Sequence, residues 1–179
     1  MSKPVFAQAR IQFLKDGISS IYKNENTPEH PVLDELKRGI EIHKYPKAWI
    51  MRLINERLKD EIISKKSFST IDQIEKYSEL TNGTIMLLSL NTLGVKNADA
   101  DMAAKNAARC IGLTNSLRAQ HAISSRHVLL PLDLAAKHKV DLRNLVEKKN
   151  NENIEEMIFD MATIANANLT KVYPFLLFN

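Results

Sequence analysis

Arginine and histidine side chains gather in the second half of this 179-residue chain, and they are its side chains best suited to bind an anion. Arg118, His121, Arg126 and His127 fall within ten consecutive residues, and Asn115 lies one helical turn before them. A guanidinium group donates parallel hydrogen bonds to phosphate or carboxylate, and imidazoles add further donors. These five residues are therefore a candidate anion-binding site.

Two other interpretations of the same residues stay open. Arg118 can pair with an acid on another helix while the remaining residues form a solvated loop, and we favour this over an anion site because surface ion pairs are common. Asn115 is favoured as a residue that makes a hydrogen bond between helices in the core, rather than as a contact to a ligand.

The chain offers no pattern for metal binding or nucleophilic catalysis. His121 and His127 lack a third ligand at a familiar spacing. The serines at 116, 124 and 125 lack a glycine elbow, and Cys110, the single cysteine, lies in an apolar stretch typical of a buried core thiol. We therefore predict no catalytic residue and no metal site.

Composition indicates one helical domain. The chain is 44% hydrophobic and 26% charged with five glycines, which is ordinary for a globular protein. Its net charge of +4 is spread along the sequence, and no aromatic platform or known module indicates binding to nucleic acid. No run of about eighteen apolar residues is present, so we do not expect a membrane span.

Apolar residues recur at helical spacing through the first half. One helix is predicted from about Val5 to Lys23. Its excess of basic residues could also indicate a mitochondrial transit peptide, but the helical spacing of its apolar residues favours a packed helix that begins the fold. A second is predicted over 32–43, and a third begins near Pro46, since proline favours a helix start. The last two are expected to form an antiparallel pair.

A long helix is predicted next, with Thr70 as its N-cap and Gly94 at its end. Its segment 85–90 is apolar nearly all round, which is typical of a helix buried in the middle of a bundle. The following helix starts near Ala98 and is rich in alanine and glycine, so neighbouring helices can approach it closely.

The last third begins with residues 123–126, which lose the helical spacing, and a short extended or turn piece over 128–130 with Pro131. Two brief helices near 133–137 and 142–146 and a final amphipathic helix are predicted after it. The predicted buried stripe of that helix is Ile154, Met157, Ile158, Met161, Ile164 and Ala165. We therefore predict an all-α fold, a bundle of about six main helices in one domain over residues 1–171, with 172–179 as a divergent apolar tail.

Three stretches of the sequence carry a family resemblance. They are Arg10-Ile11-Gln12-Phe13, with His30-Pro31-Val32 and Glu56-Arg57 after it; Ile74-Glu75-Lys76-Tyr77; and Gly112-Leu113-Thr114-Asn115-Ser116-Leu117-Arg118, with Val128-Leu129-Leu130-Pro131 and Asp133 after it. Together they resemble the squalene/phytoene synthase superfamily, whose members are all-helical and process isoprenoid diphosphates. The resemblance covers about residues 5–170 and implies a truncated isoprenoid-synthase-like fold that lacks the family's N-terminal helix.

The acids of the family are missing from the matching positions. Synthases of this family hold Mg²⁺, and through it the diphosphate leaving group, with two aspartate-rich motifs. The first motif would lie upstream of Arg10, and the second would begin directly after Arg118, where this chain has Ala-Gln-His. No Asp or Glu occurs between Asp101 and Asp133. The resemblance therefore implies a member that is not an enzyme and needs no cofactor.

Two short runs resemble one branch of that superfamily. Leu117-Arg118-Ala119 and Arg126-His127 resemble the factors that assist assembly of mitochondrial respiratory complex I. The branch implies a location at the matrix side of the mitochondrial inner membrane, with complex I subunits or other assembly factors as partners and peripheral membrane association. The competing hypotheses are a residual isoprenoid-diphosphate transferase and a protein that binds prenyl or lipid diphosphates.

Overall fold

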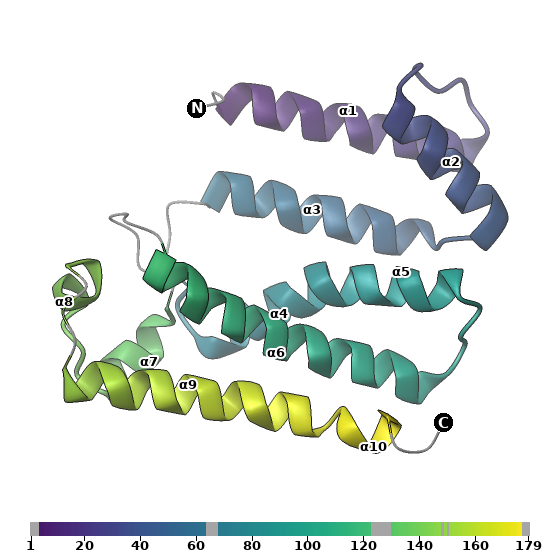
Figure 1. Ribbon diagram of the computed structural model, residues 1–179. Coiled ribbons are helices and arrows are strands. Elements are labelled where there is room, and N and C mark those ends of the chain that lie inside the picture. The colour runs from purple at the N-terminus through teal and green to yellow at the C-terminus, as the bar shows by residue number, and fades with distance from the viewer. Residues whose placement is uncertain (1–3, 64–67, 123–129, 148, 150, 177–179) are drawn as a thin grey trace.

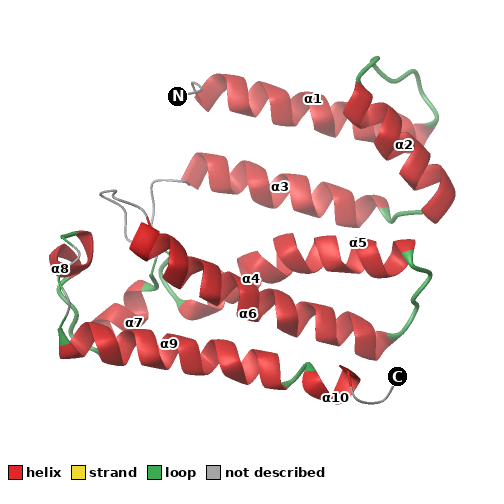
Figure 2. Cartoon of the chain, viewed as in Figure 1, coloured by secondary structure: helices red, strands yellow, loops and turns green. Residues whose placement is uncertain are grey.

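The computed structural model describes residues 4–63, 68–122, 130–147, 149 and 151–176. Every regular element in this part of the chain is a helix (Figure 2). The long helical segments are α1, α2, α3, the continuous run α4–η1–α5, α6 and α9, and α7, α8 and α10 are short. The prediction of an all-α bundle with about six main helices is therefore confirmed.

Helices α1 (Pro4–Lys23), α2 (Pro31–His43) and α3 (Lys47–Ile63) form one layer of the bundle (Figure 1). α1 and α3 lie side by side and antiparallel, whereas α2 crosses the end of α1. The expected pairing of α2 with α3 is wrong. The reason is local: Gly17 lets Leu33 of α2 press onto α1, and a methyl group at Gly17 would overlap Leu33.

The two ends of α2 follow from its sequence. His30 is the N-cap, and its Nδ1 atom accepts a hydrogen bond from the backbone N–H of Val32 at 3.3 Å, while Pro31 occupies the first turn. Lys44 ends the helix in the left-handed conformation with a φ of 54°. The core between these helices consists of buried aliphatic side chains, namely Ile18, Ile21, Leu33, Ile40 and Ile50.

The predicted long central helix is present but is not regular. Thr70 caps α4 (Ile71–Ser78) by accepting a hydrogen bond from Gln73 N–H at 3.2 Å, as expected. A π-helical segment, η1 (Glu79–Gly83), then leads into α5 (Thr84–Thr92). The π-helical segment shifts the angular positions of the side chains after it around the helix axis. The 3.6-residue spacing of buried residues in α4 therefore does not continue into α5. Ile85 is exposed although the sequence predicted it buried, and Leu87 is buried.

α6 (Ala98–Ala122) is the central helix, and its main neighbours are α4, η1, α5 and α9 (Figure 1). Its small residues permit close contact, as predicted. Gly83 of η1 faces the Ala108 side chain, and the Ser78 Oγ atom donates a hydrogen bond to the Ala108 carbonyl at 2.5 Å. Sequence-distant segments are thus joined at the centre of the fold.

The last layer comprises α7 (Leu132–Lys137), α8 (Leu142–Val146) and α9 (Glu152–Thr170), followed by the short α10 (Tyr173–Leu176). Both brief helices match their predicted ranges. Four of the six predicted stripe residues of α9 are buried, but Ile158 is 40% exposed, so its assignment to the core was wrong. The predicted extended piece over 128–130 lies outside the described residues except for Leu130, which is buried.

None of the described helices is both long enough and apolar enough to cross a lipid bilayer.

Candidate functional site

The C-terminal half of α6 carries the described part of the predicted anion site. Arg118 and Asn115 are both exposed, and they lie three residues apart, so they share one side of the helix. His121 lies in the last turn of α6, and the structure does not describe its side chain. Arg126 and His127 lie outside the described residues. The structure thus places two of the five residues together, and the anion site remains a prediction.

One alternative to the anion site fails on exposure, and the other stays a prediction. Asn115 is exposed, so it is not the interhelical hydrogen-bonding residue that the sequence indicated. No ion pair joins Arg118 to an acid whose side chain the structure describes, so its predicted pairing is not tested. Arg109, nine positions earlier, donates to Glu79 Oε2 at 2.6 and 3.1 Å. The buried asparagine that connects helices is Asn168 of α9, which donates to Glu75 Oε1 at 2.5 Å.

Carboxylates do occur beside α6, but on the side that faces α4. Glu75 of α4 and Glu79, the first residue of η1, lie about one turn apart, with Asp72 at the start of α4. All three line a cavity of about 260 Å³. Glu75 accepts the hydrogen bond from Asn168, and Glu79 is held by Arg109. Over the described ranges, no three His, Cys, Asp or Glu side chains are grouped so that they could hold a metal ion. These acids therefore connect helices.

A second charged cluster joins α7 to α9. Asp160 Oδ2 lies 2.6 Å from Lys137 Nζ and 2.8 Å from His138 Nε2, and His138 Nδ1 lies 3.4 Å from Glu156 Oε2. The hydrogen bonds from Lys137 and from His138 lower the pKa of the Asp160 carboxyl group. No local spacing pattern in the sequence indicates this role for His138, because its partners lie about twenty residues away.

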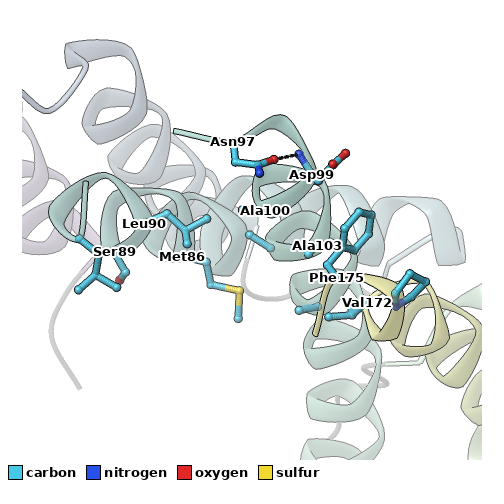
Figure 3. A pocket seen from close by; sticks show the side chains of 13 residues that line it. Met86, Ser89, Leu90, Asn97, Asp99, Ala100, Ala103, Val172 and Phe175 are labelled. Carbon is cyan, nitrogen blue, oxygen red and sulfur yellow. Dashed lines mark hydrogen bonds between the residues drawn. The ribbon is translucent and has the colours of Figure 1, made fainter. Parts of the chain in front are cut away.

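An apolar groove lies at the N-terminal half of α6 (Figure 3). It has a volume of about 760 Å³, within the usual range for ligand pockets. Its floor is formed by alanines of α6, and its walls come from α5 and from the segment around α10. The residues that we call the α6 groove are Met86, Leu90, Leu93, Ala100, Ala103, Ala104, Ala107, Val172, Pro174 and Phe175, with Ser89, Asn97 and Asp99 completing the lining.

The α6 groove is not predicted from the sequence. The alanines of α6 indicate close contact between helices, and nothing in their spacing alone indicates an open surface. That assignment holds for Ala108, which is fully buried, whereas Ala100, Ala103 and Ala107 are only partly covered. The apolar tail was the second signal, because Val172 and Phe175 supply one wall of the groove.

The groove and Arg118 lie on the same side of α6. Ala107 precedes Arg118 by eleven residues and Ala100 precedes it by eighteen, which correspond to about three and five full turns. Ile111 lies between them and is 36% exposed. This open face of α6, defined by Ala100, Ala103, Ala107, Ile111, Asn115 and Arg118, is about 27 Å long at 1.5 Å per residue. It is apolar at one end and cationic at the other.

Cys110 does not belong to this face. Its side chain is partly buried and packs against the core cluster between α6 and α9, which agrees with the prediction of a core thiol.

Comparison with known proteins connects this geometry to a family. The squalene/phytoene synthase family model matches residues 1–178. The Mus musculus protein named "NADH dehydrogenase (ubiquinone) complex I, assembly factor 6" is 32% identical over 176 residues, which cover 98% of this chain and 52% of that protein. The Homo sapiens protein of the same name is 31% identical over the same coverage. The chain thus spans about half the length of these curated relatives.

Solved structures agree on the fold. A squalene synthase, HpnC from Alicyclobacillus acidocaldarius, superposes with a TM-score of 0.81 at 14% identity, covering 92% of this chain and 62% of that one. A dehydrosqualene synthase in complex with ligand gives 0.79 at 20% identity, covering 94% and 59%. At these identities the likeness shows the fold alone. The family match over nearly the whole sequence shows more: this chain belongs to the squalene/phytoene synthase family.

Proposed function

We propose that this chain acts as an assembly factor for respiratory complex I and not as an enzyme. The observation that carries the proposal is the identity of 28–32% over nearly the whole chain to proteins named complex I assembly factor 6, from Mus musculus to Dictyostelium discoideum. The synthase structures are less similar in sequence, at 14% and 20%. We therefore infer the role from the assembly factors and take only the fold from the synthase structures.

The chemistry of α6 supports a role without catalysis. A Mg²⁺ ion that neutralises a diphosphate needs several carboxylate oxygens around it. The open face of α6 presents an asparagine amide at 115 and a guanidinium group at Arg118, which repels a divalent cation. The carboxylates of Glu75 and Glu79 lie toward α4 and hold Asn168 and Arg109. The described residues thus do not fit the family's metal.

The proposed setting is the mitochondrion, at the matrix side of the inner membrane, with complex I subunits or other assembly factors as partners. Association with the membrane would be peripheral. The support for this setting is the assembly-factor relatives, because complex I is a membrane-bound respiratory complex.

A rescue experiment tests the proposal. Cells that lack their own assembly factor 6 would receive either this chain or the full-length relative, and assembled complex I would be measured on native gels. We expect this chain to restore assembly at least in part. Restoration by the longer relative together with none by this chain, at equal protein level, would rule the proposal out for this chain.

A second candidate, binding of a prenyl or lipid diphosphate, has one observation in its favour. The open face of α6 joins an apolar groove to Arg118, and such a face suits a long hydrocarbon with an anionic head. Titration with farnesyl diphosphate, with Arg118→Ala as the test and Arg143→Ala as the control, measures this binding. Conversion of farnesyl diphosphate to a condensed product in the presence of Mg²⁺ would overturn the non-enzymatic assignment.

A further inference from the structure

The open face of α6 is unusual for the central helix of a bundle. On other sides of α6, the helices α4, η1 and α9 pack against it, and the buried residues Ala108 and Leu113 lie there. On the open face, the described neighbours are α5 and α10, and both contact its N-terminal half only, where they form the walls of the α6 groove (Figures 1 and 3). The face is therefore bounded by walls at one end and open at the other.

The groove end of this face is apolar, and several of its side chains remain partly accessible to solvent. Met86, Leu90, Ala103 and Phe175 are each only partly buried. Leu93 at its edge is 76% exposed, which is more than for any other large hydrophobic residue in the described part of the chain. Exposed apolar surface that is gathered in a concavity marks a binding surface more often than scattered apolar residues do.

The spacing of the floor residues suits the packing of a second helix along α6. Ala100, Ala103 and Ala107 recur at three and four residues, so their small side chains leave a shallow channel along the axis of α6. A helix crossing α6 at a small angle can stay in contact along such a channel and continue past Ile111. A helix also carries polar side chains that can pair with Asn115 and Arg118.

The positive charge of Arg118 at the other end of the face indicates that the partner carries an acidic side chain there. Arg118 is exposed, and no acid whose side chain the structure describes pairs with it. The groove lining contains one charged residue, Asp99, at its far edge. A carboxylate placed opposite Arg118 would gain a charge-assisted hydrogen bond. Measured from Ala107, that carboxylate lies about 17 Å along the axis, or about eleven helical residues.

We propose that the open face of α6 binds an amphipathic helix of another protein, with apolar side chains in the α6 groove and an Asp or Glu opposite Arg118. The choice of a protein partner rests on the proposed assembly role, because the interfaces that subunits bury in a permanent complex are more hydrophobic than transient ones. The apolar side chains of this helix span about two turns, and the carboxylate follows about three turns away.

Crosslinking in cells tests the geometry. A photoreactive p-benzoylphenylalanine would replace Leu93 at the groove edge in one variant of the full chain and Ile111 in a second. We expect both to crosslink to one segment of one protein, and a synthetic peptide of that segment to bind the purified chain. Crosslinks to lipid, to a second copy of this chain, to two unrelated proteins, or to nothing would overturn the proposal.

Matched substitutions test the chemistry. Leu93→Asp and Arg118→Glu should each weaken binding of that peptide at least tenfold. Phe159→Asp, at a residue 72% exposed on α9, and Arg143→Glu, at an exposed arginine of α8, should change binding less than twofold. All four positions are exposed, and equal melting temperatures would confirm intact folding. Equal losses in test and control variants would contradict the proposal.

The same cells separate this inference from the proposed function. Crosslinking to one helix without any rescue of complex I would remove the assembly role and leave the helix-binding face. Full rescue by Leu93→Asp and by Arg118→Glu would remove the helix-binding face and leave the assembly role.

Discussion

Gly112 of α6 lies directly against Ser78 of α4, so closely that a methyl group in place of the glycine hydrogen would overlap the serine side chain. Ser78 in turn donates to Ala108 O and accepts from Asn82 Nδ2 at 2.9 Å. The contact between α4 and α6 therefore depends on a residue without a side chain, at the point where the central helix meets the start of the π-helical segment.

Gly112→Ala is expected to destabilise the fold. The added methyl group must push α4 and α6 apart or displace Ser78, and overpacking of this kind costs about 1–3 kcal/mol. Urea unfolding followed by circular dichroism measures the loss. Ala162→Leu, at an exposed position of α9, is the control and should change stability by less than about 0.5 kcal/mol. Stability of the Gly112→Ala variant equal to that of the control would contradict the packing described.

The Arg109–Glu79 ion pair should matter more than a surface pair of equal length. Both it and Arg38–Glu35 have N–O distances of 2.6 Å, but the Glu79 side chain is 27% exposed and that of Glu35 67%. Because solvent screens the exposed pair, Glu35→Gln should cost less than about 0.5 kcal/mol. Glu79→Gln should cost about 1 kcal/mol, since the partly buried guanidinium loses its charged acceptor and keeps only a neutral amide oxygen. Equal losses in urea unfolding would show that burial has no effect here.

Acid should weaken the contact between α7 and α9 through Asp160. The pKa of this carboxyl is lowered below its ordinary value of 3.8, chiefly by Lys137 and then by His138. A group with a lowered folded-state pKa stabilises the fold above its ordinary pKa, and this stabilisation is lost as the pH falls below 3.8 toward the folded-state value. Unfolding of the wild type and Asp160→Asn from pH 6 to pH 3 should converge toward the acidic end.

Glu29→Gln serves as the control for that titration, because Glu29 is exposed and makes no hydrogen bond or ion pair among the described contacts. Its curve should follow the wild type over the whole range. A constant difference between wild type and Asp160→Asn at every pH would mean that the carboxylate charge does not contribute.

Two residues of α9 distinguish the observed buried face from the predicted one. Met161 is fully buried, so Met161→Ala should cost about 2–5 kcal/mol through the lost contacts and the cavity left behind. Ile158 was predicted to share that face but is 40% exposed, so Ile158→Ala should cost clearly less, about 1 kcal/mol or below. Thermal unfolding of the two variants compares them directly. A larger loss for Ile158→Ala would restore the predicted stripe.

Local patterns were sufficient to predict the helices. Hydrophobic spacing, Thr70 as a cap and the proline and glycine breaks depend on residues a few positions apart, and they determined the fold class and most helix limits. The family resemblance likewise depended on short runs such as the one ending at Arg118. The absence of acids between Asp101 and Asp133 is also a property of the sequence alone.

Tertiary structure decided which faces meet. Whether α3 packs on α1 or on α2, and whether Ile85 is buried after a π-helical turn, depends on contacts between distant segments, which no local period encodes. The same holds for the candidate site. The sequence does not distinguish Ala107 from Ala108. In the structure, Ala108 packs against Gly83, whereas Ala107 lines the groove together with Phe175. The packing of α5 and α10 distinguishes the two, and so creates the groove.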